Sequence, residues 1–158
     1  MLWSTLPTPI GDLYLAANDT ALIRVEFEGV EHDVTGERGE NAVLKLAKQQ
    51  LSEYFAGKRT EFDLPLEMTG TDLQLKVWCA LERIPFGRTK TYGELAVALT
   101  KNPQTARAVG TCCGRNPLPI IIPCHRVLGA NRALTGFGGG VWRKEWLLKH
   151  EGAWELPL

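Results

Sequence analysis

The spacing of apolar residues changes along this chain, and the change narrows the folds it can adopt. Near the start, Leu13 and Leu15 alternate with polar neighbours, and residues 22–27 (LIRVEF) do so again after a turn signal. Alternation of this kind is typical of antiparallel strands that bury one face. From about Asn41 the spacing becomes three to four residues, which predicts an amphipathic helix ending near Gly57.

Helical spacing dominates the second half of the chain. Residues 72–84 place their apolar side chains on one face, which predicts a helix. Thr91, with Glu94 three residues later, forms a capping box for a short helix over 92–99. A turn at 101–103 leads to a basic helix over 104–113. Such a pair fits a helix-turn-helix, and it fits a plain helical hairpin equally well without the charge evidence.

Three further segments complete the prediction. Residues 118–122 (LPIII) are expected to be a buried extended segment, and 136–140 (GFGGG) a loop. Residues 142–150 are expected to form a last helix, ended by Gly152. The predicted fold class is therefore α/β in the α+β sense. A small antiparallel sheet with one helix would occupy 1–66, and a mostly helical unit with a winged helix-turn-helix would occupy 67–158.

The charge also divides the chain near residue 70. Residues 1–70 hold 6 Lys and Arg against 12 Asp and Glu, and residues 71–158 hold 12 against 6, so the two parts carry −6 and +6. Between residues 84 and 144 there are nine basic residues and one acid, Glu94. A basic half suggests a polyanionic partner such as nucleic acid, although two solvated faces of different charge would give the same counts.

The cysteines and the chain start indicate the compartment. The four cysteines form no Cys-x-x-Cys pair and have no histidine at zinc-finger spacing, so we expect reduced thiols and no metal. The first residues lack a basic start and an apolar core, and the longest apolar run, 118–122, is far below the roughly 20 residues of a membrane helix. We expect a cytoplasmic protein without membrane contact.

Cys124 is the candidate nucleophile. A buried cysteine is most often an inert small hydrophobe. Three features favour reactivity here: His125 is adjacent, Arg126 adds positive charge that favours thiolate, and a glycine-rich loop follows that could close over a flat ligand.

His125 is expected to act on Cys124 indirectly. Neighbours on extended backbone point to opposite faces, so His125 would reach the thiol through a turn or a bridging water. The imidazole then needs a third group to fix its tautomer, and Glu151 is the best candidate from the sequence. A capping histidine and a solvated glutamate are the plain alternatives.

Arg107 is the candidate DNA contact. It stands among small residues in TARAVG, so its helix could approach a surface closely while one long cation projects into a groove or a gap in a base stack. A simple surface arginine would look the same in sequence.

Four strings in the second half resemble the O6-alkylguanine-DNA alkyltransferases. They are residues 110–117 (GTCCGRNP), 122–127 (IPCHRV), 136–140 (GFGGG) and 144–152 (KEWLLKHEG). The resemblance is strong from about 70 to 153 and weaker over 1–66, where this family has a small strand-rich domain.

The resemblance implies roles by position. Cys124 would accept the alkyl group, His125 would be the water-bridged base, and Glu151 the acid that orients it. Asn116 would hold the helix-turn-helix to the active-site segment, and the Tyr92 hydroxyl would serve guanine N3.

Further positions would contact the substrate and the DNA. Carbonyls of Cys124 and Val127 would accept from the guanine amino group, and the Gly138 amide would donate to O6. Arg107 would replace the flipped nucleotide in the stack. The resemblance also implies that Phe137 and Lys144 bind the substrate. The other implied DNA-binding positions are Ala106, Gly110, Thr91 and Arg115.

The implied function is DNA repair by direct reversal. A monomer would transfer the alkyl group of O6-alkylguanine, or of O4-alkylthymine, from duplex DNA to its own Cys124 once, without a cofactor. Phe137 departs from the family's usual tyrosine, and Leu73 from a usual phenylalanine. Two rivals are a non-enzymatic lesion binder, which would lack the acceptor cysteine, and a plain helix-turn-helix regulator, which leaves the cluster around Cys124 unexplained.

Overall fold

The computed structural model describes residues 1–30 and 36–154, which divide into two compact units between Met68 and Thr69. The first contains a small sheet and one helix, and the second contains four helices with a short two-stranded pairing. The predicted α+β class is confirmed.

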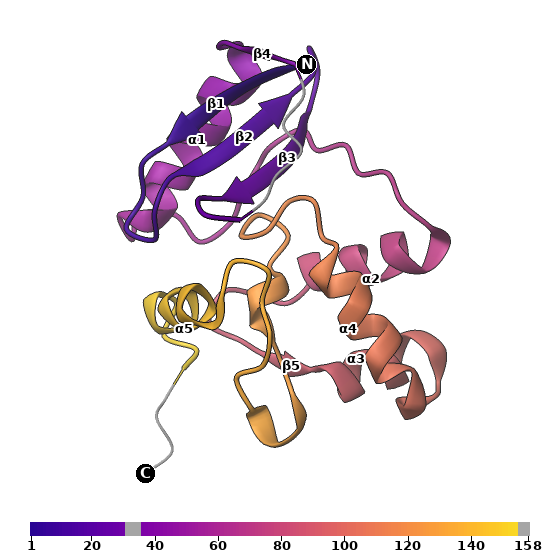
Figure 1. The fold of residues 1–158 in the computed structure, drawn as a ribbon. Helices are drawn as coiled ribbons and strands as arrows, with labels where there is room; N and C mark the ends of the chain where they lie inside the picture. The colour runs from indigo at the N-terminus through magenta and orange to yellow at the C-terminus, as the bar shows by residue number, and fades with distance from the viewer. Residues whose placement is uncertain (31–35, 155–158) are drawn as a thin grey trace. The chain divides into compact units, whose positions relative to one another are not determined.

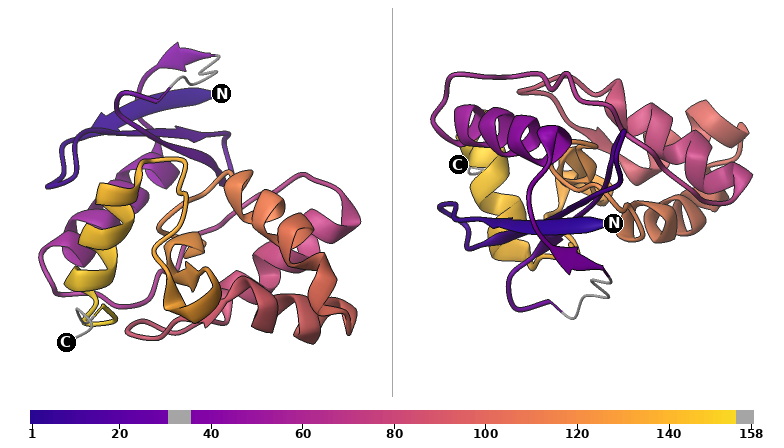
Figure 2. Two further views of the ribbon diagram at one scale, coloured as in Figure 1. Left: turned by 60° about the horizontal axis from the view of Figure 1, so that its bottom comes forward. Right: turned by 90° about the horizontal axis from the view of Figure 1, so that it is seen from above.

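The first unit is a four-stranded sheet with a helix on one face (Figures 1 and 2). The strands have the order β3-β2-β1-β4, and the antiparallel meander that the alternation predicts is made by the first three. A two-residue strand, β4, pairs with β1 in parallel and was not predicted, because two residues show no period. The bounds are β1 Leu2–Leu6, β2 Leu13–Ala17, β3 Leu22–Phe27, β4 Glu37–Arg38 and α1 Ala42–Phe55.

Alternate strand residues and one helix face build the core of this unit. Leu13 and Leu15 of β2 are fully buried, as are Leu44 and Leu51 of α1. The helix begins where the sequence predicts, because the Asn41 side chain accepts a hydrogen bond from the Leu44 amide at 2.9 Å.

The second unit contains α2 (Asp72–Glu82), α3 (Tyr92–Thr100), α4 (Ala106–Gly114) and α5 (Val141–His150). The four predicted helices of this unit are present, with bounds close to the expected ones. Helices α3 and α4, the predicted helix-turn-helix, are joined by a tight turn, Pro103–Thr105. The Trp78 indole of α2 donates to the Cys112 carbonyl of α4 at 2.9 Å and ties these helices together. A two-residue parallel pairing of β5 (Lys90–Thr91) with β6 (Val127–Leu128) completes the unit.

Residues 118–122 are buried, as predicted, but the prediction that they are extended is wrong. The Ile122 amide donates to the Leu118 carbonyl at 2.8 Å, and Ile120 has a φ of 74°, so the segment is a tight turn. The flanking prolines lack amide donors and cannot join a strand ladder. The buried backbone of this segment therefore finds its hydrogen-bond partners within its own turn and in residues beside it, such as Asn116.

Within residues 1–30 and 36–154, no helix has both the length and the apolar content that crossing a bilayer requires.

The Asn41 cap provides a test of the first unit. Asn41→Ala should lower the free energy of unfolding by about 1 kcal/mol, because it leaves the Leu44 amide without its acceptor. Asn41→Asp retains the oxygen and should keep most of that stability. Urea unfolding followed by circular dichroism measures both, and equal midpoints for Asn41→Ala and the unchanged chain would refute the assignment of the cap.

Candidate active site

Cys124 begins a short helical turn, Cys124–Arg126, that directly follows the 118–122 turn. Its side chain is buried, and burial raises the pKa of the thiol, while a hydrogen bond with the Asn116 side chain and the charge of Lys144 lower it. The balance keeps the resting thiol protonated at neutral pH. A neighbouring base must therefore take its proton before the sulfur can attack.

Asn116 fixes this segment from the end of α4. Its amide group donates to the Ile122 carbonyl at 2.7 Å, and its side-chain oxygen accepts from the Leu118 amide at 2.9 Å. The same side chain also lowers the pKa of the Cys124 thiol. One residue therefore links the helix-turn-helix, the 118–122 turn and Cys124.

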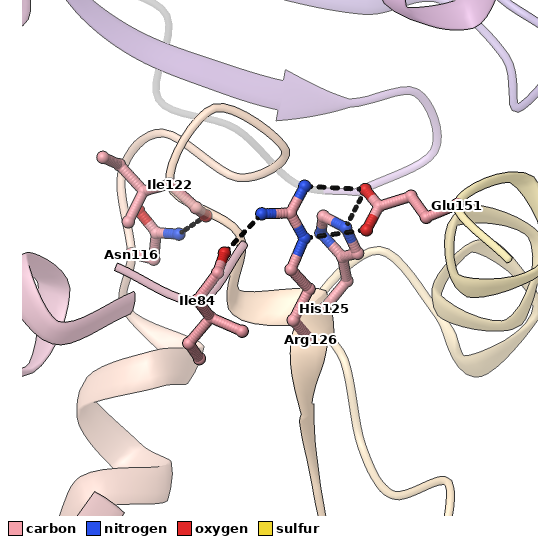
Figure 3. A network of polar contacts seen from close by, with 6 residues as sticks. All are labelled: Ile84, Asn116, Ile122, His125, Arg126 and Glu151. Atoms are coloured by element: carbon pink, nitrogen blue, oxygen red, sulfur yellow. Dashed lines mark hydrogen bonds and ion pairs between the residues drawn. The ribbon is translucent and has the colours of Figure 1, made fainter. Parts of the chain in front are cut away.

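His125, Arg126 and Glu151 form a buried network (Figure 3). The His125 Nε2 atom lies 2.8 Å from Glu151 Oε2, and Arg126 donates to both carboxylate oxygens at 2.7 and 3.0 Å. A further Arg126 nitrogen donates to the Ile84 carbonyl at 2.6 Å. Glu151, at the end of α5, is thus brought to His125, 26 residues earlier in the chain.

This geometry corrects the expected role of Arg126. The sequence placed its charge beside the thiol, but the guanidinium pairs with Glu151, and the cation that acts on Cys124 is Lys144. A planar guanidinium matches both oxygens of a carboxylate, which explains why it turns to Glu151.

The network sets the protonation of each member. Burial by itself raises the pKa of Glu151, but the His125 and Arg126 contacts outweigh it and bring the pKa to about 2. Burial lowers the pKa of His125. At neutral pH an ionised Glu151 therefore faces a neutral imidazole.

The tautomer of His125 follows from this pairing. A carboxylate accepts, so the imidazole proton lies on Nε2 and Nδ1 carries the lone pair. Nδ1 is buried and hydrogen bonds no other atom of the described residues. The imidazole is thus held with its basic nitrogen available for a proton.

Tyr92 and Lys144 complete the surroundings of Cys124. Burial, then the thiols of Cys113 and Cys124, raise the pKa of Tyr92 to about 12, while a hydrogen bond with the Thr135 side chain lowers it. The phenol is therefore a neutral donor. The fully buried Lys144 donates to the Thr135 carbonyl at 3.2 Å, and its nitrogen lies 5.8 Å from the centre of the Tyr92 ring.

The expected substrate positions on the loop and on β6 are placed as follows. Val127 opens β6 and is buried. Phe137 is half-buried, and its carbonyl accepts from the Gly140 amide at 2.8 Å. Gly138 is exposed, and a Cβ added there would meet nothing within 4 Å. The loop backbone at Gly138 is therefore accessible to a ligand.

The expected DNA-binding positions lie on or beside α3 and α4. Arg107 and Arg115 are exposed and Ala106 is half-buried. Gly110 and Thr91 also have local structural contacts: the Tyr92 ring packs against Gly110, and the Thr91 side chain accepts from the Glu94 amide at 3.1 Å.

Only some of the cations in the basic segment, residues 84–144, are exposed at the surface. Of its nine cations, Arg126, Arg143 and Lys144 are buried, and these hold the site and its loop. The six exposed ones are Arg88, Lys90, Lys101, Arg107, Arg115 and Arg132.

Among residues 1–30 and 36–154, no group of three or more His, Cys, Asp or Glu side chains could hold a metal ion.

Comparison with known proteins identifies the family. Residues 1–68 match the ribonuclease-like domain of 6-O-methylguanine DNA methyltransferase, and residues 72–153 match its DNA-binding domain. The chain belongs to this methyltransferase family. The resemblance predicted from the sequence is confirmed.

Individual members of the family are similar over nearly the whole chain. The methylated-DNA–protein-cysteine methyltransferase of Mycolicibacterium paratuberculosis is 44% identical over 94% of this chain and 91% of its own. The constitutive enzyme of Bacillus subtilis is 46% identical over 87% and 86%. The crystal structure of Mycobacterium tuberculosis OGT in complex with DNA superposes with a TM-score of 0.90 at 43% identity, over 97% and 94% of the two chains.

Two residues of this candidate site were not singled out in the sequence analysis. Thr135 joins Tyr92 and Lys144, and Arg143 donates to the Gly139 carbonyl at 2.9 Å. Thr135 carries no signal in sequence, because its contacts come from α3 and α5. Arg143 was counted only as one of the basic residues, although an arginine beside a glycine-rich loop is a signal that could have been used.

The carboxylate of Glu151 yields a pH-dependent prediction. Its folded pKa of about 2 lies below the unfolded value of about 4.3, so it contributes stability above pH 4.3 that is lost as the pH falls toward 2. Glu151→Gln should cost about 3 kcal/mol of unfolding free energy at pH 7, because it leaves the buried Arg126 unpaired. Urea unfolding at pH 7 and pH 3 measures this cost, which should shrink at the lower pH; an equal cost at both would contradict the pairing.

Proposed function

We propose that this protein repairs alkylated duplex DNA by moving the alkyl group from guanine O6, or from thymine O4, onto Cys124. One observation carries the proposal: a buried thiol follows directly on the Asn116-braced turn and precedes a histidine whose tautomer is fixed by Glu151. The same unit contains a helix-turn-helix with exposed cations.

The proton path follows from the geometry of His125. We infer that a water relays the thiol proton to Nδ1, the nitrogen with the lone pair. The imidazolium that forms faces the Glu151 carboxylate at 2.8 Å, which stabilises its charge. Arg126 keeps that carboxylate ionised and oriented.

The transfer itself is a single displacement. The sulfur of Cys124 forms a bond to the alkyl carbon as the bond from that carbon to guanine O6 breaks, and O6 keeps the electron pair. Tyr92, a neutral phenol beside the thiol, is suited to donate toward the guanine ring as negative charge develops. The Gly138 amide on the exposed loop is suited to donate to O6.

The product is a thioether between Cys124 and the alkyl group. A thioether is not a leaving group under cellular conditions, so each molecule acts once. The reaction as proposed needs one chain, no cofactor and no metal, and we place it in the cytoplasm.

DNA binding supplies access to the buried alkyl carbon. The nucleotide must leave the base stack before the thiol can reach it. Arg107, exposed on α4, is proposed to fill the gap, with Arg115 and the other surface cations contacting phosphates. The crystallised complex of the Mycobacterium tuberculosis relative with DNA supports a DNA partner for this chain.

A non-enzymatic lesion binder and a helix-turn-helix regulator are the rival functions. Neither requires a thiol with an oriented base. Mass spectrometry after incubation with O6-methylguanine duplex DNA distinguishes them, because only a methyltransferase gains one methylene, and that gain is expected on the peptide containing Cys124.

The first prediction of this mechanism concerns the acceptor. Cys124→Ser should abolish transfer while leaving DNA affinity within about threefold, because phosphate contacts dominate affinity. Methyl incorporation is followed by mass spectrometry and binding by fluorescence anisotropy. Methylation of the serine variant, for example at Cys113, would eliminate Cys124 as the sole acceptor.

Arg107 provides the second prediction. Arg107→Ala should slow transfer from duplex DNA by at least about tenfold, on the scale of 1.4 kcal/mol, and leave the reaction with free O6-benzylguanine nearly unchanged, since a free base needs no flipping. Lys149→Ala, at an exposed cation of α5 to which no DNA contact is assigned, is the matched control. Equal slowing on both substrates would show that Arg107 has another role.

A further inference from the structure

The glycine loop, residues 136–140, is held at both ends by neighbouring cations of α5. Lys144 donates to the carbonyl of Thr135, just before the loop, at 3.2 Å. Arg143 donates from Nη1 to the carbonyl of Gly139, near its far end, at 2.9 Å. Both side chains are buried.

Trp142 reinforces the far end of the loop. The guanidinium carbon of Arg143 lies 4.5 Å from the centre of the Trp142 ring, close enough for cation–π attraction. The indole also lies against Gly140, where an added Cβ would come within 3.2 Å of it. Gly140 has a φ of 91°, which favours glycine. Hydrogen bond, ring and backbone conformation therefore all restrict the same end of the loop.

A buried guanidinium is costly in a protein interior. Removing its charge from water requires hydrogen-bond acceptors in return, and an apolar side chain of similar volume would fill the space at lower cost. The planar fork of arginine can donate to a carbonyl while its face stacks on an aromatic ring, and lysine can do only the first of these fully. The chemistry of Arg143 thus fits a role in holding the loop.

We propose that Arg143 is a positioning residue for alkyl transfer, fixing the glycine loop so that its backbone meets the guanine in one orientation. The proposal rests on the proposed function, in which the Gly138 amide donates to O6. Gly138 immediately precedes the anchored Gly139. If Gly139 is free to move, the Gly138 amide no longer points at O6 in a fixed direction. Loss of one well-placed donor to a developing oxyanion slows other enzymes by about 10²–10³, and a loosened donor should cost part of that.

The test compares three variants in the full chain. Arg143→Met removes the hydrogen bond and the charge, and Arg143→Lys restores the charge and one donor. Lys149→Met removes an exposed cation of the same helix and is the matched control.

Three measurements are made on each variant. The first is the maximal single-turnover rate and half-saturating concentration with free O6-benzylguanine. The second is the rate at which iodoacetamide, which needs no guanine site, alkylates Cys124. The third is hydrogen–deuterium exchange of the peptide that spans the glycine loop.

We expect Arg143→Met to reduce the maximal transfer rate by about tenfold, to leave iodoacetamide alkylation within twofold, and to speed exchange in the loop. Arg143→Lys should recover part of the rate, and Lys149→Met should match the unchanged chain. If Arg143→Met does not fold, an intermediate rate and intermediate exchange in Arg143→Lys carry the same conclusion.

Two results would overturn the proposal. One is an unchanged transfer rate or unchanged loop exchange in Arg143→Met. The other is a parallel fall in transfer and in iodoacetamide alkylation, which would show a general structural role. Failure of the unchanged chain to take up any alkyl group would instead refute the proposed function, and loop exchange would still decide whether Arg143 anchors the loop.

Discussion

The Glu151 carboxylate is the centre on which the site depends. It accepts from the His125 imidazole and from two nitrogens of Arg126, all within 3.0 Å and all buried. Bringing these charges out of water is unfavourable unless they are paired and hydrogen bonded, and Arg126 uses its third nitrogen to donate to the Ile84 carbonyl. The network therefore joins the end of α5, the turn that carries Cys124 and Ile84, the second residue after α2.

The need of buried cations for hydrogen-bond partners also explains the rest of the site. Of the three buried cations between residues 84 and 144, Arg126 fixes the carboxylate, Lys144 acts on Cys124 and holds Thr135, and Arg143 holds Gly139. A basic segment thus serves two purposes. Its exposed members are available to DNA, and its buried members arrange the backbone and the acid–base pair.

Most of the fold follows from local patterns. The alternation around Leu13 predicts the meander, and the capping box at Thr91 predicts the start of α3 to the residue. Segments whose apolar residues show no regular spacing were either not predicted or predicted wrongly. β4 and the pairing of β5 with β6 are two residues long, and the 118–122 turn is decided by its flanking prolines and by Asn116.

Motif strings and periodicity are local properties of the chain, so they predict the family, the division into two parts and the candidates Cys124, His125 and Glu151. Which of these groups face one another depends on the packing of elements far apart in the chain. The Arg126 guanidinium pairs with Glu151, the charge of Lys144 lowers the pKa of Cys124, and Arg143 donates to the Gly139 carbonyl. Buried polar groups must find partners, and several of these partners, such as Glu151 for Arg126, lie on elements distant in sequence that packing brings together.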